Sequence, residues 1–122
     1  MKEDKSVEQL KNFILTNIEE KKGEAIKVLD LRKIENAIAD YFVICNATSK
    51  IHAQTISDHI VRQVRTNLKQ RPLSVEGEQN AFWILVDYAS VVVHIFLPEY
   101  REFYDLEGLW GEVIAEYNYN NA

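Results

Sequence analysis

Three histidines are the side chains best suited to metal binding or proton transfer. His52 and His59 are seven residues apart, which places them on a similar face of a predicted helix. A structural metal site generally needs about four ligands, and no cysteine or carboxylate lies at a supporting spacing. His94 lies in an otherwise apolar segment, where a hydrogen-bonded histidine is favoured over a catalytic one. The sequence therefore predicts neither a metal site nor a catalytic histidine.

One cysteine and two pairs of acids could serve in nucleophilic or metal-dependent catalysis. Cys45 ends an apolar run, and because burial raises the pKa of a thiol, we interpret it as inert packing. The acid pairs are Glu76 with Glu78 and Asp105 with Glu107. Phosphoryl transfer also needs a phosphate-binding loop, and the four glycines of this sequence form no such motif. We therefore predict that both pairs are solvated charge, and that the protein is not an enzyme and needs no cofactor.

The net charge of the protein indicates which classes of macromolecule it can bind. The formal charge is −5 at pH 7 and the isoelectric point is near 5.2. Nucleic-acid binding depends on clustered Lys and Arg. The positive cluster in this sequence is typical of the solvated face of a helix and comprises Arg62, Arg65, Lys69 and Arg71. We therefore expect no strong binding to free nucleic acid and a better match to a basic protein.

The sequence carries no recognisable targeting or membrane signal. Its amino terminus lacks an apolar signal segment, and the longest apolar stretch, 91–97, is too short to span a bilayer. A lone cysteine cannot form an internal disulfide, which favours a reducing compartment. These features predict a cytoplasmic protein without membrane contact.

Aromatic residues and acids are concentrated in the last third of the chain. The aromatic residues are Trp83, Tyr88, Tyr100, Phe103, Tyr104 and Trp110. The acids among them are Asp87, Glu99, Glu102, Asp105, Glu107 and Glu112. Some of the aromatic residues must fill the core, but aromatic anchors surrounded by charge are also typical of binding surfaces. The region therefore favours a binding protein over a catalyst.

Hydrophobic periodicity predicts three helices. Apolar residues at helical spacing indicate a helix over about 6–22, which Gly23 ends as its C′ residue. A second helix, roughly 49–69, has apolar residues at four-residue intervals and follows a Thr-Ser pair that can cap it. Pro98 opens a third helix, over 99–109.

The remaining apolar runs predict a sheet. Strands are expected at 25–31, 40–45, 73–76, 82–88 and 91–97. The join at Ala89-Ser90 is so short that the last two strands should form an antiparallel hairpin. Strands outnumber crossovers, so we predict an α/β fold with a mixed sheet of about five strands, covered by helices. The domain is single, 1–122, with a core over about 6–112 and a polar tail from Tyr117 that should fray.

Three segments resemble the signatures of the ribosomal silencing factor (Iojap-like) family. The first is Asp40-Tyr41-Phe42-Val43-Ile44-Cys45, with Ala47-Thr48-Ser49 and His52. The second is Val75-Glu76-Gly77, with Trp83 and Val86-Asp87-Tyr88. The third is Val91-Val92-Val93-His94-Ile95-Phe96, with Arg101, Tyr104, Leu106-Glu107 and Leu109-Trp110. They occur in unbroken order, which is far more specific than any short motif.

The resemblance implies a fold, a partner and a mechanism. The fold would be nucleotidyltransferase-like without that superfamily's catalytic acids, and the free protein would be a homodimer. The partner would be the fourteenth protein of the large ribosomal subunit, bound where the small subunit docks, so that translation falls when nutrients are short. The implied binding residues are Trp83 and Asp87, followed by Glu76, Tyr88 and His94.

One departure from the family pattern concerns the hairpin turn. The family usually turns at Gly-Asp, where this chain has Ala89-Ser90. A primed two-residue turn needs residues that tolerate positive φ, which Ala does not. The turn is therefore either of another type or slightly strained. Two alternative functions are an active nucleotidyltransferase-like enzyme and a dimeric adaptor unrelated to ribosomes.

Overall fold

A six-stranded mixed sheet forms the centre of the structure, a computed structural model that describes residues 5–109 and 115–119. The strands are β1 (Glu24–Asp30), β2 (Tyr41–Asn46), β3 (Ser74–Glu76), β4 (Trp83–Asp87), β5 (Val91–Phe96) and β6 (Ala115–Tyr119). Their order is β3-β4-β5-β2-β1-β6, with β2 and β5 parallel and the other neighbours antiparallel. The predicted mixed sheet of an α/β fold is confirmed.

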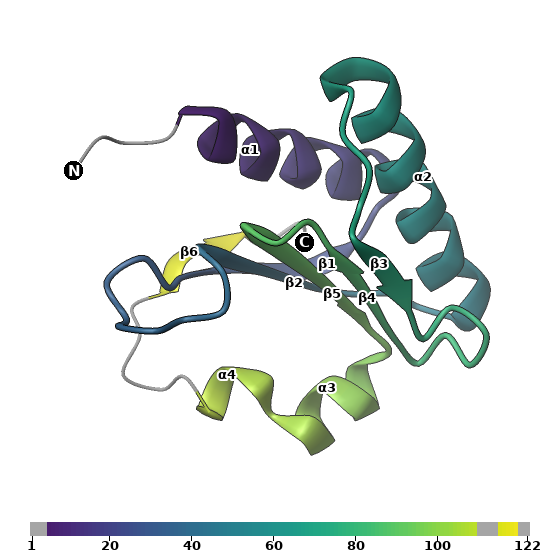
Figure 1. Ribbon diagram of the computed structural model, residues 1–122. Coiled ribbons are helices and arrows are strands. Elements are labelled where there is room, and N and C mark those ends of the chain that lie inside the picture. Colours follow the sequence, from purple (N-terminus) through teal and green to yellow (C-terminus); the bar gives the residue numbers. More distant parts are fainter. Residues whose placement is uncertain (1–4, 110–114, 120–122) are drawn as a thin grey trace.

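Helices cover both faces of the sheet. The long helices α1 (Lys5–Glu20) and α2 (Lys50–Leu68) lie on one face, here called the first face, and the short helices α3 (Pro98–Tyr104) and α4 (Leu106–Leu109) lie on the second face (Figure 1). Ser49 caps α2, because its side chain accepts a hydrogen bond from the backbone N–H of His52 at 3.0 Å. Both long helices agree with the predicted ranges to within two residues.

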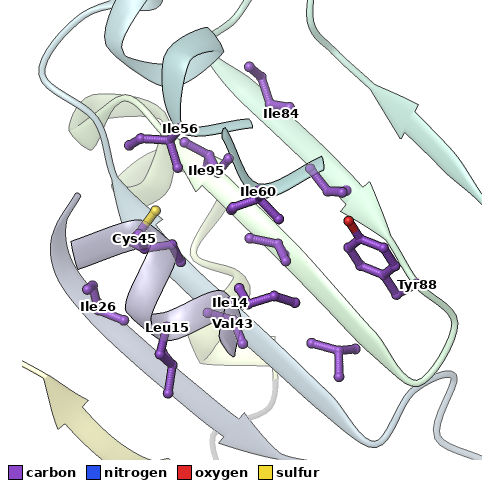
Figure 2. Packing of buried hydrophobic residues seen from close by; sticks show 14 of the residues in the cluster. Ile14, Leu15, Ile26, Val43, Cys45, Ile56, Ile60, Ile84, Tyr88 and Ile95 are labelled. Carbon is purple, nitrogen blue, oxygen red and sulfur yellow. The ribbon is translucent and has the colours of Figure 1, made fainter. Parts of the chain in front are cut away.

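The main hydrophobic core fills the space between the first face and the two long helices. Ile14 of α1 and Ile60 of α2 are fully buried against Val43, Ile84 and Ile95 of the sheet (Figure 2). Alternation along each strand sends every second side chain into this core. The intervening side chains form a smaller cluster on the second face, around Phe42, Ile44, Phe96 and Leu106.

The end of α1 corrects the role predicted for Gly23. The left-handed residue is Lys22, with φ of 64°, while Gly23 donates its backbone N–H to the Ile18 carbonyl at 2.9 Å. This hydrogen bond belongs to a helix-ending motif in which Lys22 is the C′ residue. Gly23 is required for a different reason: a Cβ there would lie 2.4 Å from Cγ2 of Ile18.

The predicted helix 99–109 is two helices, because the backbone turns left-handed at Asp105, with φ of 46°. Arg101 anchors the pair to the sheet. Its guanidinium donates to the Ala25 carbonyl at 2.7 Å and to Asn46 Oδ1 at 2.9 Å. It also donates to both carboxylate oxygens of Glu107, at 3.2 and 3.0 Å. Glu107 is therefore paired and not solvated, contrary to the sequence prediction.

The sixth strand corrects the prediction of a fraying tail. Residues 115–119 pair with β1 in antiparallel register, with Tyr117 opposite Val28 and Tyr119 opposite Ile26. The strand, Ala-Glu-Tyr-Asn-Tyr, alternates apolar and polar residues, a period-two signal that the expectation of a polar, fraying tail overlooked. The candidate residues Trp110 and Glu112 and the end of the tail, 120–122, lie outside the described residues.

Candidate docking surface

Four of the five residues implied as partner-binding share the second face. Trp83 and Asp87 of β4 point to it by alternation, and so do Glu76 of β3 and His94 of β5. Tyr88 points to the first face, where it packs in the main core and is 7% exposed (Figure 2). Burial raises the pKa of Tyr88 to about 12. Tyr88 is therefore a core residue and does not share the surface of the other four, while its role in binding stays a prediction.

Leu85 belongs to the same surface, although the sequence reasoning missed it. It lies between Trp83 and Asp87 on β4, faces the second cluster and is partly exposed. Its cross-strand neighbours are Glu76 on one side and His94 on the other. The period-two spacing of β4 could have identified it. We name the partly open area of Glu76, Trp83, Leu85 and Asp87 the β3–β4 surface.

The Trp83 ring is held on several sides. It stacks on Phe96 with ring centroids 4.9 Å apart and lies 4.9 Å from the Tyr104 ring of α3. Its indole Nε1 donates a hydrogen bond to Nδ1 of His94 at 3.1 Å. A Cβ on Gly77 would lie 2.1 Å from the Trp83 carbonyl oxygen, so the loop after β3 also packs tightly against this residue. These contacts fix the orientation of the Trp83 ring, which remains partly exposed.

His94 orients Trp83 and does not reach the surface. Its side chain is buried, at 3% exposed, which confirms the hydrogen-bonded histidine predicted from its apolar strand. Because an indole N–H can only donate, Nδ1 of His94 must accept and Nε2 must carry the proton. Burial lowers the pKa of His94 to about 4, so the ring is neutral at pH 7. Nε2 has no hydrogen-bond partner among the described residues. Direct contact with a partner is therefore not open to His94.

Asp87 stabilises the hairpin turn while facing the open surface. Its Oδ1 accepts a hydrogen bond from the backbone N–H of Ala89 at 2.7 Å. Ala89 has φ of 69°, and the next N–H, of Ser90, donates to the Tyr88 carbonyl at 2.8 Å. A side chain at positive φ is strained, so the structure decides for the strained hairpin. The Asp87 carboxylate partly offsets that strain.

Glu76 supplies the most exposed acid of the β3–β4 surface. It lies on the edge strand β3 and accepts a hydrogen bond from the Ser74 hydroxyl at 3.3 Å. Glu76 is opposite Leu85 and Asp87 is two residues beyond Leu85 on β4, so the two acids lie on the same face of the sheet as Leu85 and Trp83. An apolar centre with acidic neighbours is suited to a protein partner of positive charge.

The other candidate groups are engaged in structural roles. His52 accepts from the Thr48 N–H at 2.9 Å through Nδ1 and reaches the Lys21 carbonyl at 2.7 Å through Nε2. His59 contacts the Glu20 carboxylate at 2.8 Å, between the two long helices. Among residues 5–109 and 115–119 no group of three or more His, Cys, Asp or Glu could hold a metal ion.

Cys45 is fully buried, and burial raises its pKa to about 12, the direction that its apolar strand predicts. No helix in the described part of the chain combines the length and the apolar character needed to cross a bilayer.

Comparisons with known proteins identify the family. The family model described as "Ribosomal silencing factor during starvation" matches residues 4–121. The ribosomal silencing factor RsfS of Halalkalibacterium halodurans is 34% identical over 107 residues, covering 88% of this chain and 90% of that protein. "Mitochondrial assembly of ribosomal large subunit protein 1" of Mus musculus is 39% identical over 79 residues, covering 62% of this chain and 34% of that protein.

The fold has a counterpart among solved structures. A crystal structure of a Chromobacterium violaceum protein superposes with a TM-score of 0.82 at 23% sequence identity, covering 95% of this chain and 92% of that chain. The similarity in sequence runs through the strands that build the second face as well as through the core helices. On this basis the chain belongs to the ribosomal silencing factor family.

Proposed function

We propose that this protein is a non-catalytic factor that docks on the fourteenth protein of the large ribosomal subunit through its β3–β4 surface. While bound, it keeps the small subunit away and lowers translation when nutrients are short. Family membership supports the silencing role. The name of the mouse relative refers to assembly of the large ribosomal subunit, which supports the choice of subunit.

The observation that carries the proposal is the chemistry of the β3–β4 surface. Trp83 is oriented by His94 and is partly exposed, and Glu76 and Asp87 place carboxylates on the same face, Glu76 opposite Leu85 and Asp87 at the far end of β4. Pre-oriented aromatic side chains are common binding anchors because little conformational freedom is lost on docking. The net charge of −5 suits a basic ribosomal protein better than rRNA.

Docking by itself explains silencing. A specific protein interface commonly buries about 1,600 Å² in total, and a domain of this size can supply its half of that area from one face. A protein bound at the joining surface excludes the small subunit from the same volume. The mechanism therefore requires occupancy alone and consumes no nucleotide.

Co-sedimentation with purified large subunits tests the proposal, and Glu76→Lys is the informative variant. Glu76 is exposed and lies on an edge strand, so the substitution reverses a charge with little effect on the fold. Facing a basic partner, it should weaken binding by about tenfold. Glu19→Lys is the matched control, since Glu19 is exposed on α1, which covers the first face.

The result that supports the proposal is wild-type protein in the large-subunit pellet, with Glu19→Lys equal to it and Glu76→Lys reduced. Trp83→Ala is less informative, because Trp83 packs on Phe96 and its removal also weakens the second cluster. Wild-type protein that remained in the supernatant at low salt would show that the large subunit is not its partner.

A further inference from the structure

The apolar part of the β3–β4 surface continues onto helix α3. The Tyr104 ring lies 4.9 Å from the Trp83 ring, and the Phe103 ring meets Tyr104 edge-to-face at 5.1 Å. Phe103 is 79% exposed and Tyr104 is 44% exposed. Three aromatic rings therefore form a continuous strip that leads from the sheet to α3, and its exposure increases along the way.

Contacts among the described residues do not account for the exposed aromatic ring of Phe103. Helix α3 is held by Tyr100, which stacks on Phe82 with ring centroids 4.3 Å apart, and by the Arg101 hydrogen bonds to the sheet. No residue of α3 is fully buried. The Phe103 ring thus leaves most of its apolar surface in water, which is unfavourable unless another molecule covers it.

The charges around the strip select the kind of molecule that would cover it. The exposed acids of this segment are Glu99, Glu102 and Asp105, and Glu99 lies one helical turn before Phe103 on the same face. Arg101, the basic residue of α3, is turned inward and paired with Glu107. The surface is therefore apolar with acidic neighbours, which matches a basic protein surface and repels the phosphates of RNA.

We propose that α3 is the second half of the docking surface, and that Phe103 is an anchor inserted into an apolar site on the same basic ribosomal protein. This inference rests on the proposed function. It assigns the strip of Trp83, Tyr104 and Phe103 to one partner, with the sheet holding the Trp83 end and α3 carrying the Phe103 end.

Phe103→Ala tests the inference in a binding titration against purified large subunits at fixed salt. The variant should weaken binding by about tenfold or more, as expected for loss of an aromatic anchor. Phe103→Tyr keeps the ring and should retain most of the affinity. Ile51→Ala is the matched control, because Ile51 is 74% exposed on α2, on the opposite side of the sheet. It should bind like the wild type.

The possible results separate this inference from the proposed function. If Phe103→Ala binds normally while Glu76→Lys is weakened, the docking surface stops at the sheet and the inference alone fails. If the wild-type protein does not bind large subunits, both fail. A Phe103→Ala variant that loses self-association in sedimentation velocity but binds subunits normally would assign Phe103 to a second copy of this chain and overturn the inference. Unfolding of the Phe103→Ala variant, measured by circular dichroism, would also overturn the inference, because it would show that Phe103 stabilises the fold.

Discussion

At the scale of single residues, the hairpin turn combines strain with a compensating contact. Ala89 has φ of 69°, and the Asp87 carboxylate accepts its backbone N–H at 2.7 Å. A left-handed conformation costs an L-residue roughly 1–2 kcal/mol, whereas glycine adopts it freely. The backbone conformation of Ala89 therefore lowers the stability of the folded protein.

Ala89→Gly should raise the free energy of unfolding by about 0.5–1 kcal/mol. The gain is smaller than the strain because glycine has more freedom to lose on folding. The midpoint of a urea denaturation curve measures it. Ser90→Gly is the control, since Ser90 is not at positive φ and glycine there brings only the entropic cost. A decrease in stability for Ala89→Gly would show that the turn is not strained.

His94 makes stability depend on pH in a defined window. Burial lowers its pKa in the folded protein to about 4, compared with an ordinary value of 6.5. The unfolded chain therefore binds more protons between these values, and stability falls as the pH falls from about 6.5 towards 4. The full loss is on the order of 3 kcal/mol.

His94→Phe should remove most of that dependence, since it replaces one aromatic ring by another that cannot be protonated. Urea denaturation of both proteins at pH 7 and pH 4.5 gives the comparison. The variant should be less stable at pH 7, because Nε1 of Trp83 loses its acceptor. An equal fall in stability for both proteins would mean that other groups cause the acid sensitivity.

At the scale of elements, helices α3 and α4 depend on Arg101. Its side chain is 12% exposed, and its contacts join the helices to β1, β2 and Glu107. Burial raises the pKa of Glu107, but hydrogen bonds and charge from Arg101, together with Lys27, outweigh that effect and hold the pKa below its usual range. Without the interactions of Arg101, these two short helices would have few contacts to hold them on the second face, because they contain few buried residues.

Arg101→Met should lower the free energy of unfolding by about 2–3 kcal/mol, because it leaves the partly buried Glu107 without its main partner. Hydrogen exchange should increase most in α3 and α4. Arg62→Met, at an exposed position of α2, serves as the control and should change stability little. Unchanged exchange in α3 and α4 would show that apolar packing alone holds them.

At the scale of the whole molecule, the proposed mechanism predicts an effect of the order of addition. Protein added to separated subunits should reduce the joined-ribosome peak in a sucrose gradient, without nucleotide. Ribosomes that have already joined should resist, because the docking site is then covered. High salt should weaken the effect, since charge complementarity is screened. Normal joining in the presence of saturating bound protein would contradict steric exclusion.

Periodicity and motif order in the sequence were enough to predict the two long helices, five of the six described strands and the family of this protein. The long helices and the β4–β5 hairpin follow from periodicities that many residues share, so no single exception hides them. The strand β6 was missed because its alternation covers only five residues at the start of a polar tail, and its pairing with β1 joins segments far apart in the sequence. The break at Asp105 was missed because one left-handed residue does not disturb the pattern of the residues around it.

Which side chains are exposed on the second face depends on the tertiary structure. The family resemblance implied Trp83 and Asp87 first and Tyr88 and His94 after them as binding residues, and strand alternation and helix packing bury Tyr88 and His94. Contacts between distant positions also needed the fold: the hydrogen bond from Arg101 to Ala25 joins residues 76 positions apart. The type and spacing of side chains determine local secondary structure. Which face of the sheet a side chain lies on, and which elements cover that face, depend on how the whole chain folds.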